Sequence, residues 1–219
     1  MKILCLGDSW TKGYGVMRDW TRYLPFDVKN GAGDGAGYVE ILKQFKRSYN
    51  DSYDLVIVGW SGATRDDYLE FSITTDESIE HFKDKSLDDI LNRWHEHIDE
   101  IVNTAKCPVI HFSVFGDVPG KHYDNFLETS FLEYLANQDG IYFKYNIPLF
   151  EFDWLNENNF KVTGPFGKKY FPKNWKRACV EREAVRDQGS FLYCGHPNQR
   201  GHKLWAKFME MEIDCLFAK

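Results

Sequence analysis

Two short apolar runs, each followed by a glycine, constrain the fold of this 219-residue chain more than any other feature. The first is KILCL at residues 2–6, before Gly7, and the second is DLVIV at residues 54–58, before Gly59. Near-continuous apolar runs of this length, without polar alternation, are typical of strands that are buried on both faces. The chain is therefore predicted to build a parallel sheet with helices on both sides.

Three further segments extend the predicted sheet. A short strand is predicted around Val28, where the chain runs into the glycine-rich segment at residues 30–37. The runs PVIHFSV at 108–114 and IYFKY at 141–145 are the other two. Together these segments predict a central, mostly parallel sheet of about five strands. The turns at the carboxyl ends of such strands lie side by side, and ligands bind there.

Helical periodicity fills the intervals between these strands. One helix is predicted to follow residue 37, and another covers residues 86–104 with Ser86 as its cap. A third closes the chain, with a predicted apolar stripe of Leu204, Phe208, Met211 and Cys215. Strands that alternate with amphipathic helices predict an α/β protein with three layers, α/β/α.

The chain is predicted to form one domain over residues 1–219, because no repeat, low-complexity segment or linker divides it. Its 43% hydrophobic and 27% charged residues are typical of a globular protein. Residues 146–190 are the least regular part and are expected to be a long surface excursion near the site. The aromatic content of 16% favours aromatic-rich packing over an aromatic-lined cleft.

Charge and hydropathy exclude some partners. The formal net charge of −6 argues against nucleic-acid binding, which requires a basic face. No stretch has the apolar length that a membrane span needs, and the opening residues do not read as a secretory signal. The five scattered cysteines are expected to be free thiols, so a cytoplasmic location is the default expectation. The oligomeric state is left open.

The turn Gly7-Asp8-Ser9 follows the first predicted strand directly. A serine in this turn can present its hydroxyl to a cleft while its backbone N–H lies at the start of a helix, where developing negative charge is favoured. Ser9 is therefore a candidate nucleophile and oxyanion donor. The structural alternative is that Ser9 only caps the helix.

A second candidate is His196, in the stretch GHPNQRGH just before the final helix. Histidine titrates in the range that lets it take a proton from a serine hydroxyl and return it. Pro197 restricts the backbone after it, and Asn198 is suited to cap the following helix. The imidazole would then be held on a short, stiff turn, although a histidine seen alone is as readily an exposed loop residue.

These blocks together resemble the SGNH (GDSL-type) hydrolase family. GDS after the first strand, a glycine-rich second turn, a third turn after DLVIV, and HP near the C-terminus occur in the family's order. The resemblance implies a flavodoxin-like α/β/α fold, Ser9 as nucleophile and His196 as general base. It also implies an oxyanion hole made by the backbone amides of Ser9 and Gly35, with the Ser61 hydroxyl as a further donor. Which glycine of the segment donates is left open, within two residues of Gly35.

The third block departs from the family pattern. It is normally Gly-x-Asn-Asp, and here it reads Gly59-Trp60-Ser61-Gly62, so a shorter hydroxyl donor replaces an asparagine amide. Loss of one such donor can lower a rate by about a hundredfold or more. Some family members share Gly-Trp-Ser/Thr with a downstream arginine, which Arg65 matches, so we interpret the change as a subfamily trait.

The second departure concerns the group that orients the base. The family places an aspartate three residues before the histidine, and Tyr193 stands there in this chain. A backbone carbonyl, Tyr193 itself or Asp187 is expected to orient His196 instead, with slower turnover as the result. Asp8, Arg65 and Tyr193 are accordingly predicted to be supporting residues.

The other histidines and the glycines of the sequence do not form a pattern that is typical of a metal site or of a nucleotide-binding site. His95 and His97 lie in a predicted helix, where residues two apart point in different directions and cannot share one metal ion. Residues 7–15 match neither the dinucleotide fingerprint nor the P-loop. His202 is expected to pack on or cap the final helix, and His111 to be a core or strand-end histidine. No metal or organic cofactor is expected.

The chain is therefore predicted to be a carboxylic ester hydrolase that forms an acyl-enzyme on Ser9. The resemblance implies a small-molecule substrate with a short acyl group, for which an acetylated carbohydrate is the candidate. The two departures keep open a second hypothesis, in which the chain is a catalytically impaired binding module on the same fold, for a carbohydrate or another small ligand.

Overall fold

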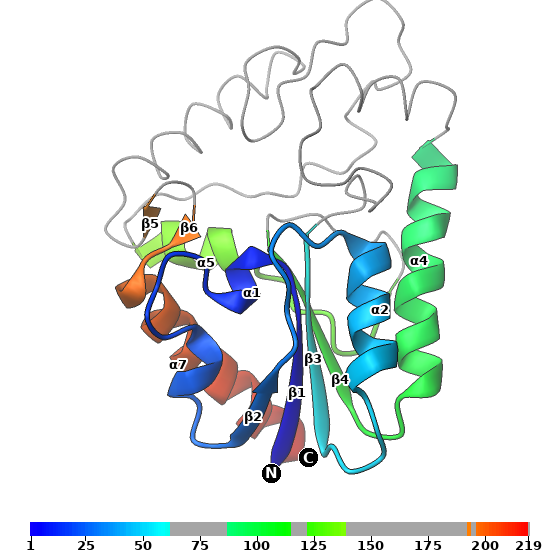
Figure 1. Ribbon diagram of the computed structural model, residues 1–219, viewed down its shortest axis with the longest axis horizontal. Helices are drawn as coiled ribbons and strands as arrows, with labels where there is room; N and C mark the ends of the chain where they lie inside the picture. The colour runs from blue at the N-terminus through cyan, green and yellow to red at the C-terminus, as the bar shows by residue number, and fades with distance from the viewer. Residues whose placement is uncertain (62–86, 115–121, 139–191, 194–195, 219) are drawn as a thin grey trace, which may run out of the picture.

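The computed structural model describes residues 1–61, 87–114, 122–138, 192–193 and 196–218 (Figure 1). At its centre lies a sheet in the order β2-β1-β3-β4, and each neighbouring pair of its strands is parallel. Its strands are β1 (Lys2–Gly7), β2 (Asp27–Asn30), β3 (Leu55–Trp60) and β4 (Val109–Ser113). A second, two-stranded antiparallel sheet pairs β5 (Leu192–Tyr193) with β6 (His196–Pro197).

Four of the predicted strands are confirmed, each to within a few residues. β3 runs beyond its predicted end at Gly59 as far as Trp60, which is fully buried. The predicted strand at 141–145 lies outside the described residues. At the outer edge of β4, His111 forms an isolated parallel bridge with Phe126.

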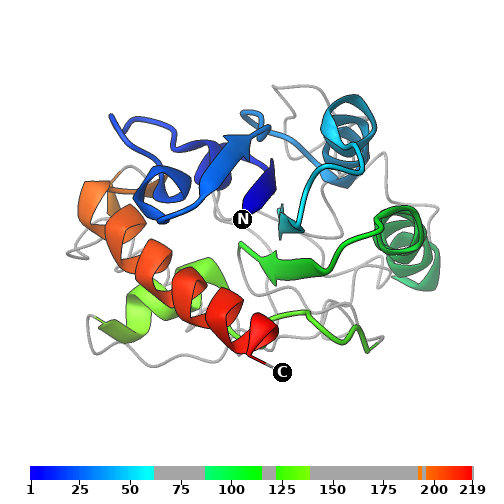
Figure 2. The same ribbon diagram turned by 90° about the horizontal axis from the view of Figure 1, so that it is seen from below.

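Helices cover both faces of the sheet, which confirms the three-layer α/β/α architecture. Figure 2 shows α2 and α4 on one face and η1, α5 and α7 on the other. None of the helices in the described part of the chain combines the length and the apolar character that a membrane crossing requires. Their bounds are α1 (Ser9–Lys12), η1 (Trp20–Tyr23), α2 (Tyr38–Ser48), α4 (Leu87–Thr104), α5 (Phe131–Gln138) and α7 (Gln199–Phe217).

Successive residues of β1 enter opposite cores, because side chains alternate across a strand. Ile3 and Cys5 pack in the cluster that contains α5 and α7, whereas Leu4 and Leu6 pack in the cluster that contains α2 and α4. All four are completely buried. This two-sided burial is the reason why β1 is apolar on both faces from Ile3 to Leu6.

The buried face of α7 differs from the prediction. Met211 is 63% exposed and Cys215 is also exposed, so they do not belong to the core-facing stripe. The helix instead buries a face rotated by about one position, which includes Gly201, His202, Trp205, Ala206, Met209 and Ile213. The helix has apolar residues on two adjacent sides, and packing against Phe131 selects the side with Trp205, whose ring stacks on that phenylalanine at 4.4 Å.

Large aromatic side chains fill both cores, as the composition predicts. The fully buried ones include Trp10, Trp20, Trp60, Trp94, Trp205, Tyr38, Phe45, Phe112 and Phe131. Edge-to-face contacts recur among them, for example between Trp10 and Phe131 at 5.3 Å. Each such side chain removes a large apolar area from water, so these aromatic residues stabilise the two cores by packing.

The carboxyl ends of β1 and β3 meet at two glycines. Gly7 lies opposite Gly59 in the ladder. A Cβ on Gly7 would come within 2.8 Å of the carbonyl oxygen of Gly59 and within 2.5 Å of Thr11 Oγ1. Gly7 also has φ +149°, a conformation that side-chain-bearing residues rarely adopt. Two glycines are therefore required where the chain turns from β1 toward α1.

Candidate active site

Asp8, and not Ser9, is the N-cap of α1. The buried carboxylate of Asp8 accepts a hydrogen bond from the backbone N–H of Trp10 at 2.9 Å. Ser9 is the first helical residue and is 8% exposed. Because a neighbouring carboxylate satisfies the helix start, the hydroxyl of Ser9 does not serve as its cap.

The Ser9 hydroxyl meets an imidazole from the far end of the chain. Ser9 Oγ and His196 Nε2 lie 2.9 Å apart, across 187 positions of sequence. This distance is within hydrogen-bond reach, the separation needed for a base to accept a proton from a nucleophile. The two candidate residues are thus brought together at the carboxyl end of β1.

The backbone around His196 explains its placement. β6 holds His196 opposite Tyr193 of β5, and Pro197 after it is buried. The next residue, Asn198, caps α7: its side-chain oxygen accepts hydrogen bonds from the N–H groups of Arg200 and Gly201, at 2.9 and 3.0 Å. The predicted cap is confirmed. It fixes the backbone directly after His196 at the start of α7.

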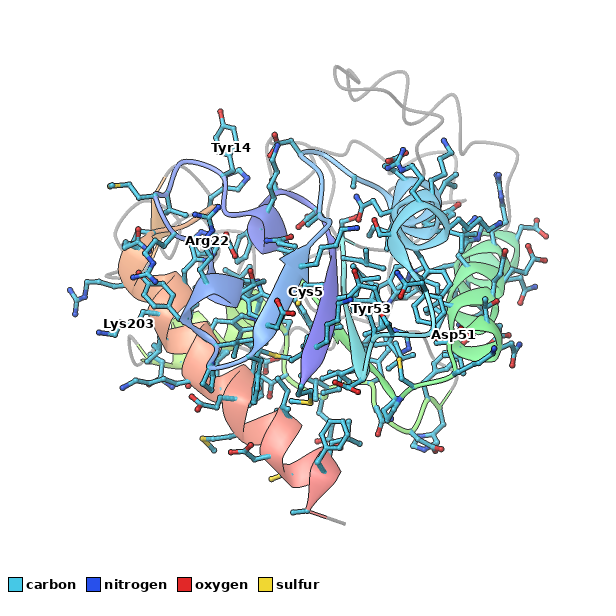
Figure 3. The ribbon with its side chains drawn as sticks, turned by 60° about the horizontal axis from the view of Figure 1, so that its bottom comes forward. Cys5, Tyr14, Arg22, Asp51, Tyr53 and Lys203 are labelled. Atoms are coloured by element: carbon cyan, nitrogen blue, oxygen red, sulfur yellow. The ribbon has the colours of Figure 1, made fainter. Side chains whose placement is uncertain are left out.

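Two aromatic rings of the α1 region lie beside the imidazole. The ring centroids of Tyr14 and His196 are 5.0 Å apart, and those of Trp10 and His196 are 6.3 Å apart. Tyr14 is 58% exposed and projects outward from the loop after α1 (Figure 3). Sequence reasoning did not single out Tyr14, because its position near His196 depends on how the two ends of the chain dock.

The glycine-rich segment at residues 30–37 lies against the turn Gly7-Asp8-Ser9, which carries the candidate nucleophile and is called the nucleophile turn below. The N–H of Gly31 donates to the carbonyl of Cys5 at 2.8 Å, and the N–H of Gly33 donates to the carbonyl of Gly7 at 3.0 Å. Gly35 follows with φ +68°, in the left-handed region. This segment therefore continues beside β1 past the end of β2 as far as Gly33, and Gly35 follows two residues later.

Polar side chains also join this segment to α1. Asn30 Nδ2 donates to the carbonyl of Thr11 at 2.9 Å. Lys12 forms an ion pair with Asp34, and both side chains are partly exposed. An exposed ion pair of this kind contributes little stability, about 0–1 kcal/mol.

Ser61 uses its hydroxyl to hold the glycine-rich segment. It is 6% exposed, and its Oγ donates to the carbonyl of Ala36 at 2.8 Å. The hydroxyl proton is therefore directed at a backbone oxygen in this structure. The contribution of Ser61 to an oxyanion hole stays a prediction.

Several predicted residues cannot be placed. Arg65, Asp187 and the excursion at 146–190 lie outside the described residues, and Tyr193 is described by its backbone alone. The single domain over residues 1–219 stays a prediction. Within those ranges, no cluster of three or more His, Cys, Asp or Glu side chains is arranged to hold a metal ion.

Two other histidines belong to the core. His202 is fully buried, and burial lowers its pKa to about 4, with a further lowering from the charge of His196 and an opposing effect from Asp19. Burial alone lowers the pKa of His111 to about 3, and Trp60 Nε1 donates to its Nδ1 at 3.1 Å. Both are neutral at physiological pH, as expected for packed core histidines.

Sequence reasoning missed one buried polar residue close to the nucleophile turn. Gln44 is 2% exposed on the face of α2 that packs against the sheet. Its amide bonds the backbone of Gly7 in both directions, at 3.0 and 3.1 Å. The available signal was a glutamine between Ile41 and Phe45 on an otherwise apolar helix face, where a polar side chain requires a partner.

No protein-family model matches the chain, and no curated protein sequence matches it. Among solved structures, the chain is similar to a candidate acylhydrolase from Bacteroides fragilis, at 13% identity and a TM-score of 0.45, over 98% of this chain and 87% of that one. It is also similar to a member of the lipolytic protein G-D-S-L family from Veillonella parvula, at 15% identity and a TM-score of 0.39, over 100% of this chain and 99% of that one.

A third similar structure is a catalytic mutant of an acetylxylan esterase from Geobacillus stearothermophilus, at 12% identity and a TM-score of 0.44, over 97% of this chain and 93% of that one. At identities and TM-scores this low, the likeness carries no argument about chemistry, which rests on the site residues of this chain.

Proposed function

We propose that the protein is a serine ester hydrolase of the SGNH (GDSL) type, with Ser9 as nucleophile and His196 as general base. The observation that carries the proposal is the 2.9 Å separation between Ser9 Oγ and His196 Nε2. A neutral imidazole at this distance can accept the hydroxyl proton as the oxygen attacks. Hydroxyl and imidazole in contact at the carboxyl end of a parallel strand form the nucleophile–base pair that acyl transfer requires.

The reaction proceeds in two steps. Ser9 Oγ attacks the ester carbonyl while His196 takes its proton, and the imidazolium then returns that proton to the alcohol that leaves. An acyl group remains on Ser9. In the second step, water gives a proton to His196 and attacks the acyl carbonyl, and the proton returns to Ser9 Oγ as the carboxylic acid departs.

Negative charge on the carbonyl oxygen is stabilised by backbone N–H groups. The N–H of Ser9 belongs to the first turn of α1, where amide groups have no partner within the helix. The N–H of Gly35 is the second proposed donor, since its segment is bonded to the nucleophile turn through Gly33 and Gly7. Ser61 is the third, which requires its hydroxyl to leave the carbonyl of Ala36.

The proposed substrate is a small ester with a short acyl group, and an acetylated carbohydrate is its specific form. The family resemblance of the sequence motifs supports this choice. The exposed ring of Tyr14 beside His196 adds an apolar surface on which the alcohol part of such a substrate can lie. We propose no metal or organic cofactor for this reaction.

The competing hypothesis is a binding module that has lost catalysis. Tyr193 in place of an acidic residue and Ser61 in the third block motivate it. It requires no contact between Ser9 and His196, whereas hydrolysis depends on that contact. The hydrogen-bond distance between them therefore favours the enzyme.

Hydrolysis of p-nitrophenyl acetate tests the proposal. The Ser9→Ala and His196→Ala variants are each expected to lower kcat by about a thousandfold, because each removes a member of a unit that acts together. Ser52→Ala is the matched control, since Ser52 is an exposed serine whose hydroxyl bonds Asn50, remote from the site. It is expected to keep the wild-type rate.

A fluorophosphonate probe separates the two hypotheses. An active serine hydrolase should label on Ser9 in the wild type and in Ser52→Ala, but not in Ser9→Ala. If the wild type resists labelling while an acetylated sugar still raises its melting temperature, the chain is a binding module. Equal hydrolysis by the wild type and Ser9→Ala would remove Ser9 from the mechanism.

A further inference from the structure

Gln44 makes an unusual contact with the strand end that carries the nucleophile turn. Its Oε1 accepts a hydrogen bond from the N–H of Gly7 at 3.0 Å, and its Nε2 donates to the carbonyl of Gly7 at 3.1 Å. The orientation of the amide is set by its partners, because the backbone N–H can only donate and the carbonyl can only accept. One side chain therefore satisfies both backbone groups of one residue, as a neighbouring strand would.

This contact lies where the regular ladder ends. The pairing of β1 with β2 ends at Cys5 and Asn30, two residues before Gly7. Beyond that point the carbonyl of Gly7 accepts from both Gly33 N–H, at 3.0 Å, and Gln44 Nε2. The acceptor for the N–H of Gly7 is Gln44 Oε1, so the side chain replaces the missing part of the ladder.

Gln44 also contacts the segment that carries the proposed oxyanion donor. A Cβ on Gly33 would lie 3.1 Å from Gln44 Nε2, so the amide packs directly against that glycine. Gly7 is two residues before Ser9, and Gly33 is two residues before Gly35. A single buried amide is thus in contact with both chain segments whose relative position decides whether an acyl group fits between nucleophile and oxyanion donor.

These segments are also joined by the hydrogen bonds from Gly33 N–H to Gly7 O and from Asn30 Nδ2 to Thr11 O, and by one exposed ion pair, which is a weaker restraint. The ion pair of Lys12 and Asp34 is partly exposed to solvent, and long exposed side chains hold a geometry loosely. Gln44, in contrast, is 2% exposed and anchored on α2, which packs against the sheet. Buried hydrogen bonds with both partners satisfied are strong positional restraints, because an alternative arrangement would leave buried polar groups without partners.

We propose that Gln44 is a positioning residue for the hydrolase reaction: it holds the nucleophile turn and the glycine-rich segment at the separation that the acyl transfer step requires. This inference rests on the proposed function. Gln44 touches no reacting atom, and it acts through Gly7 and Gly33. Its loss should therefore lower kcat, while the binding of a small ester, measured by KM, changes little.

The test uses Gln44→Met, which keeps a similar shape and removes both hydrogen bonds. Its kcat for p-nitrophenyl acetate is expected to fall by about tenfold or more, with KM within about twofold of the wild type, and the rate of fluorophosphonate labelling of Ser9 should fall with kcat. Leu42→Ala is the matched control, because Leu42 lies in the same core on the same helix and does not bond Gly7. At a temperature where both variants are folded, it should keep kcat within about twofold.

Gln44→Glu gives a second readout that does not depend on how well Gln44→Met folds. A protonated carboxyl group can accept from Gly7 N–H and donate to Gly7 O, whereas an ionised one can only accept. Burial at position 44 raises the pKa of a carboxyl group above its usual value of about 4.3, so the ratio of the kcat of Gln44→Glu to that of the wild type should fall as the pH rises from 5 to 9. A wild-type kcat in Gln44→Met, or a kcat for Gln44→Glu that exceeds that of the wild type at pH 9, where the carboxylate cannot donate to Gly7 O, would overturn the positioning role.

The failure of this inference differs from failure of the proposed function. If the wild type is active through Ser9 but Gln44→Met loses no more kcat than Leu42→Ala, only the role of Gln44 is wrong. If the activity of the wild type survives in Ser9→Ala, the nucleophile assignment and the positioning role are both overturned.

Discussion

The backbone N–H of Trp20 donates a hydrogen bond to Nδ1 of His202, 3.2 Å away, although the two residues are 182 positions apart in sequence. This bond makes Nδ1 an acceptor, so the buried imidazole is neutral and carries its proton on Nε2. It joins η1 to α7 within six residues of His196. The same helix that begins beside the proposed general base is therefore docked through a histidine that resists protonation.

The stability of the protein should fall on acidification because of His202. Its pKa is lowered from 6.5 in an unfolded chain to about 4 in the folded state, so between these pH values the unfolded chain binds the extra proton. The contribution of His202 is fully present above pH 6.5 and is lost as the pH falls toward 4, by about 3 kcal/mol. Urea denaturation at pH 7.5 and 4.5 measures the loss.

The variant His202→Gln provides the comparison, because glutamine can still accept from Trp20 N–H but does not titrate. Its loss of stability between the two pH values should be smaller than that of the wild type by about 3 kcal/mol. Carboxylates and His111 titrate in both proteins, so their contributions cancel. An unchanged pH dependence in the variant would contradict the assignment.

The cap of α7 should contribute measurably to stability. Asn198 accepts hydrogen bonds from Arg200 and Gly201, and Asn198→Ala leaves both N–H groups without this partner. We expect a loss of about 1 kcal/mol in the free energy of unfolding. Asn198→Asp keeps a cap of similar strength and should stay close to the wild type; equal losses in the two variants would show that capping is not the cause.

The close approach of β3 to its neighbours should make Gly59 intolerant of a side chain. A Cβ at this position would lie 2.6 Å from Phe112 Cζ and 2.6 Å from Thr11 Oγ1. Gly59→Ala is expected to destabilise the fold by about 3 kcal/mol through overpacking. Gly15→Ala is the control: no atom lies within 4 Å of its Cβ, and only its φ of +75° is strained. It should lose about 1 kcal/mol.

The aromatic contact of Tyr14 should affect activity more than stability. Its ring lies 5.0 Å from that of His196 and is mostly exposed. Tyr14→Ala removes this contact and is expected to lower kcat/KM by about threefold to tenfold, the equivalent of one aromatic pair. Tyr14→Phe keeps the ring and should retain the wild-type value. If Phe and Ala at this position behave alike, the ring contact has no role.

Local patterns in the sequence were sufficient for most of the fold. The apolar run that became β1 and the helical period that became α2 and α4 are properties of a few neighbouring residues, so they can be recognised without knowing what they pack against. The GDS and HP motifs made Ser9 and His196 candidates, and their roles were inferred from the resemblance of all four blocks to the SGNH family. The buried face of α7 was missed, because two apolar sides were available and only docking against Phe131 selects one.

The sequence by itself determined the strands β1 to β4, the helices α2, α4 and α7, and the residue types that can perform acyl transfer. Only the tertiary structure decided that Ser9 and His196 lie 2.9 Å apart, that Ser61 bonds Ala36, and that Gln44 holds Gly7. The physical reason is that periodicity and capping act over a few residues, whereas these hydrogen bonds depend on the order of the strands and the docking of helices. Such partners are specified by the whole folded chain.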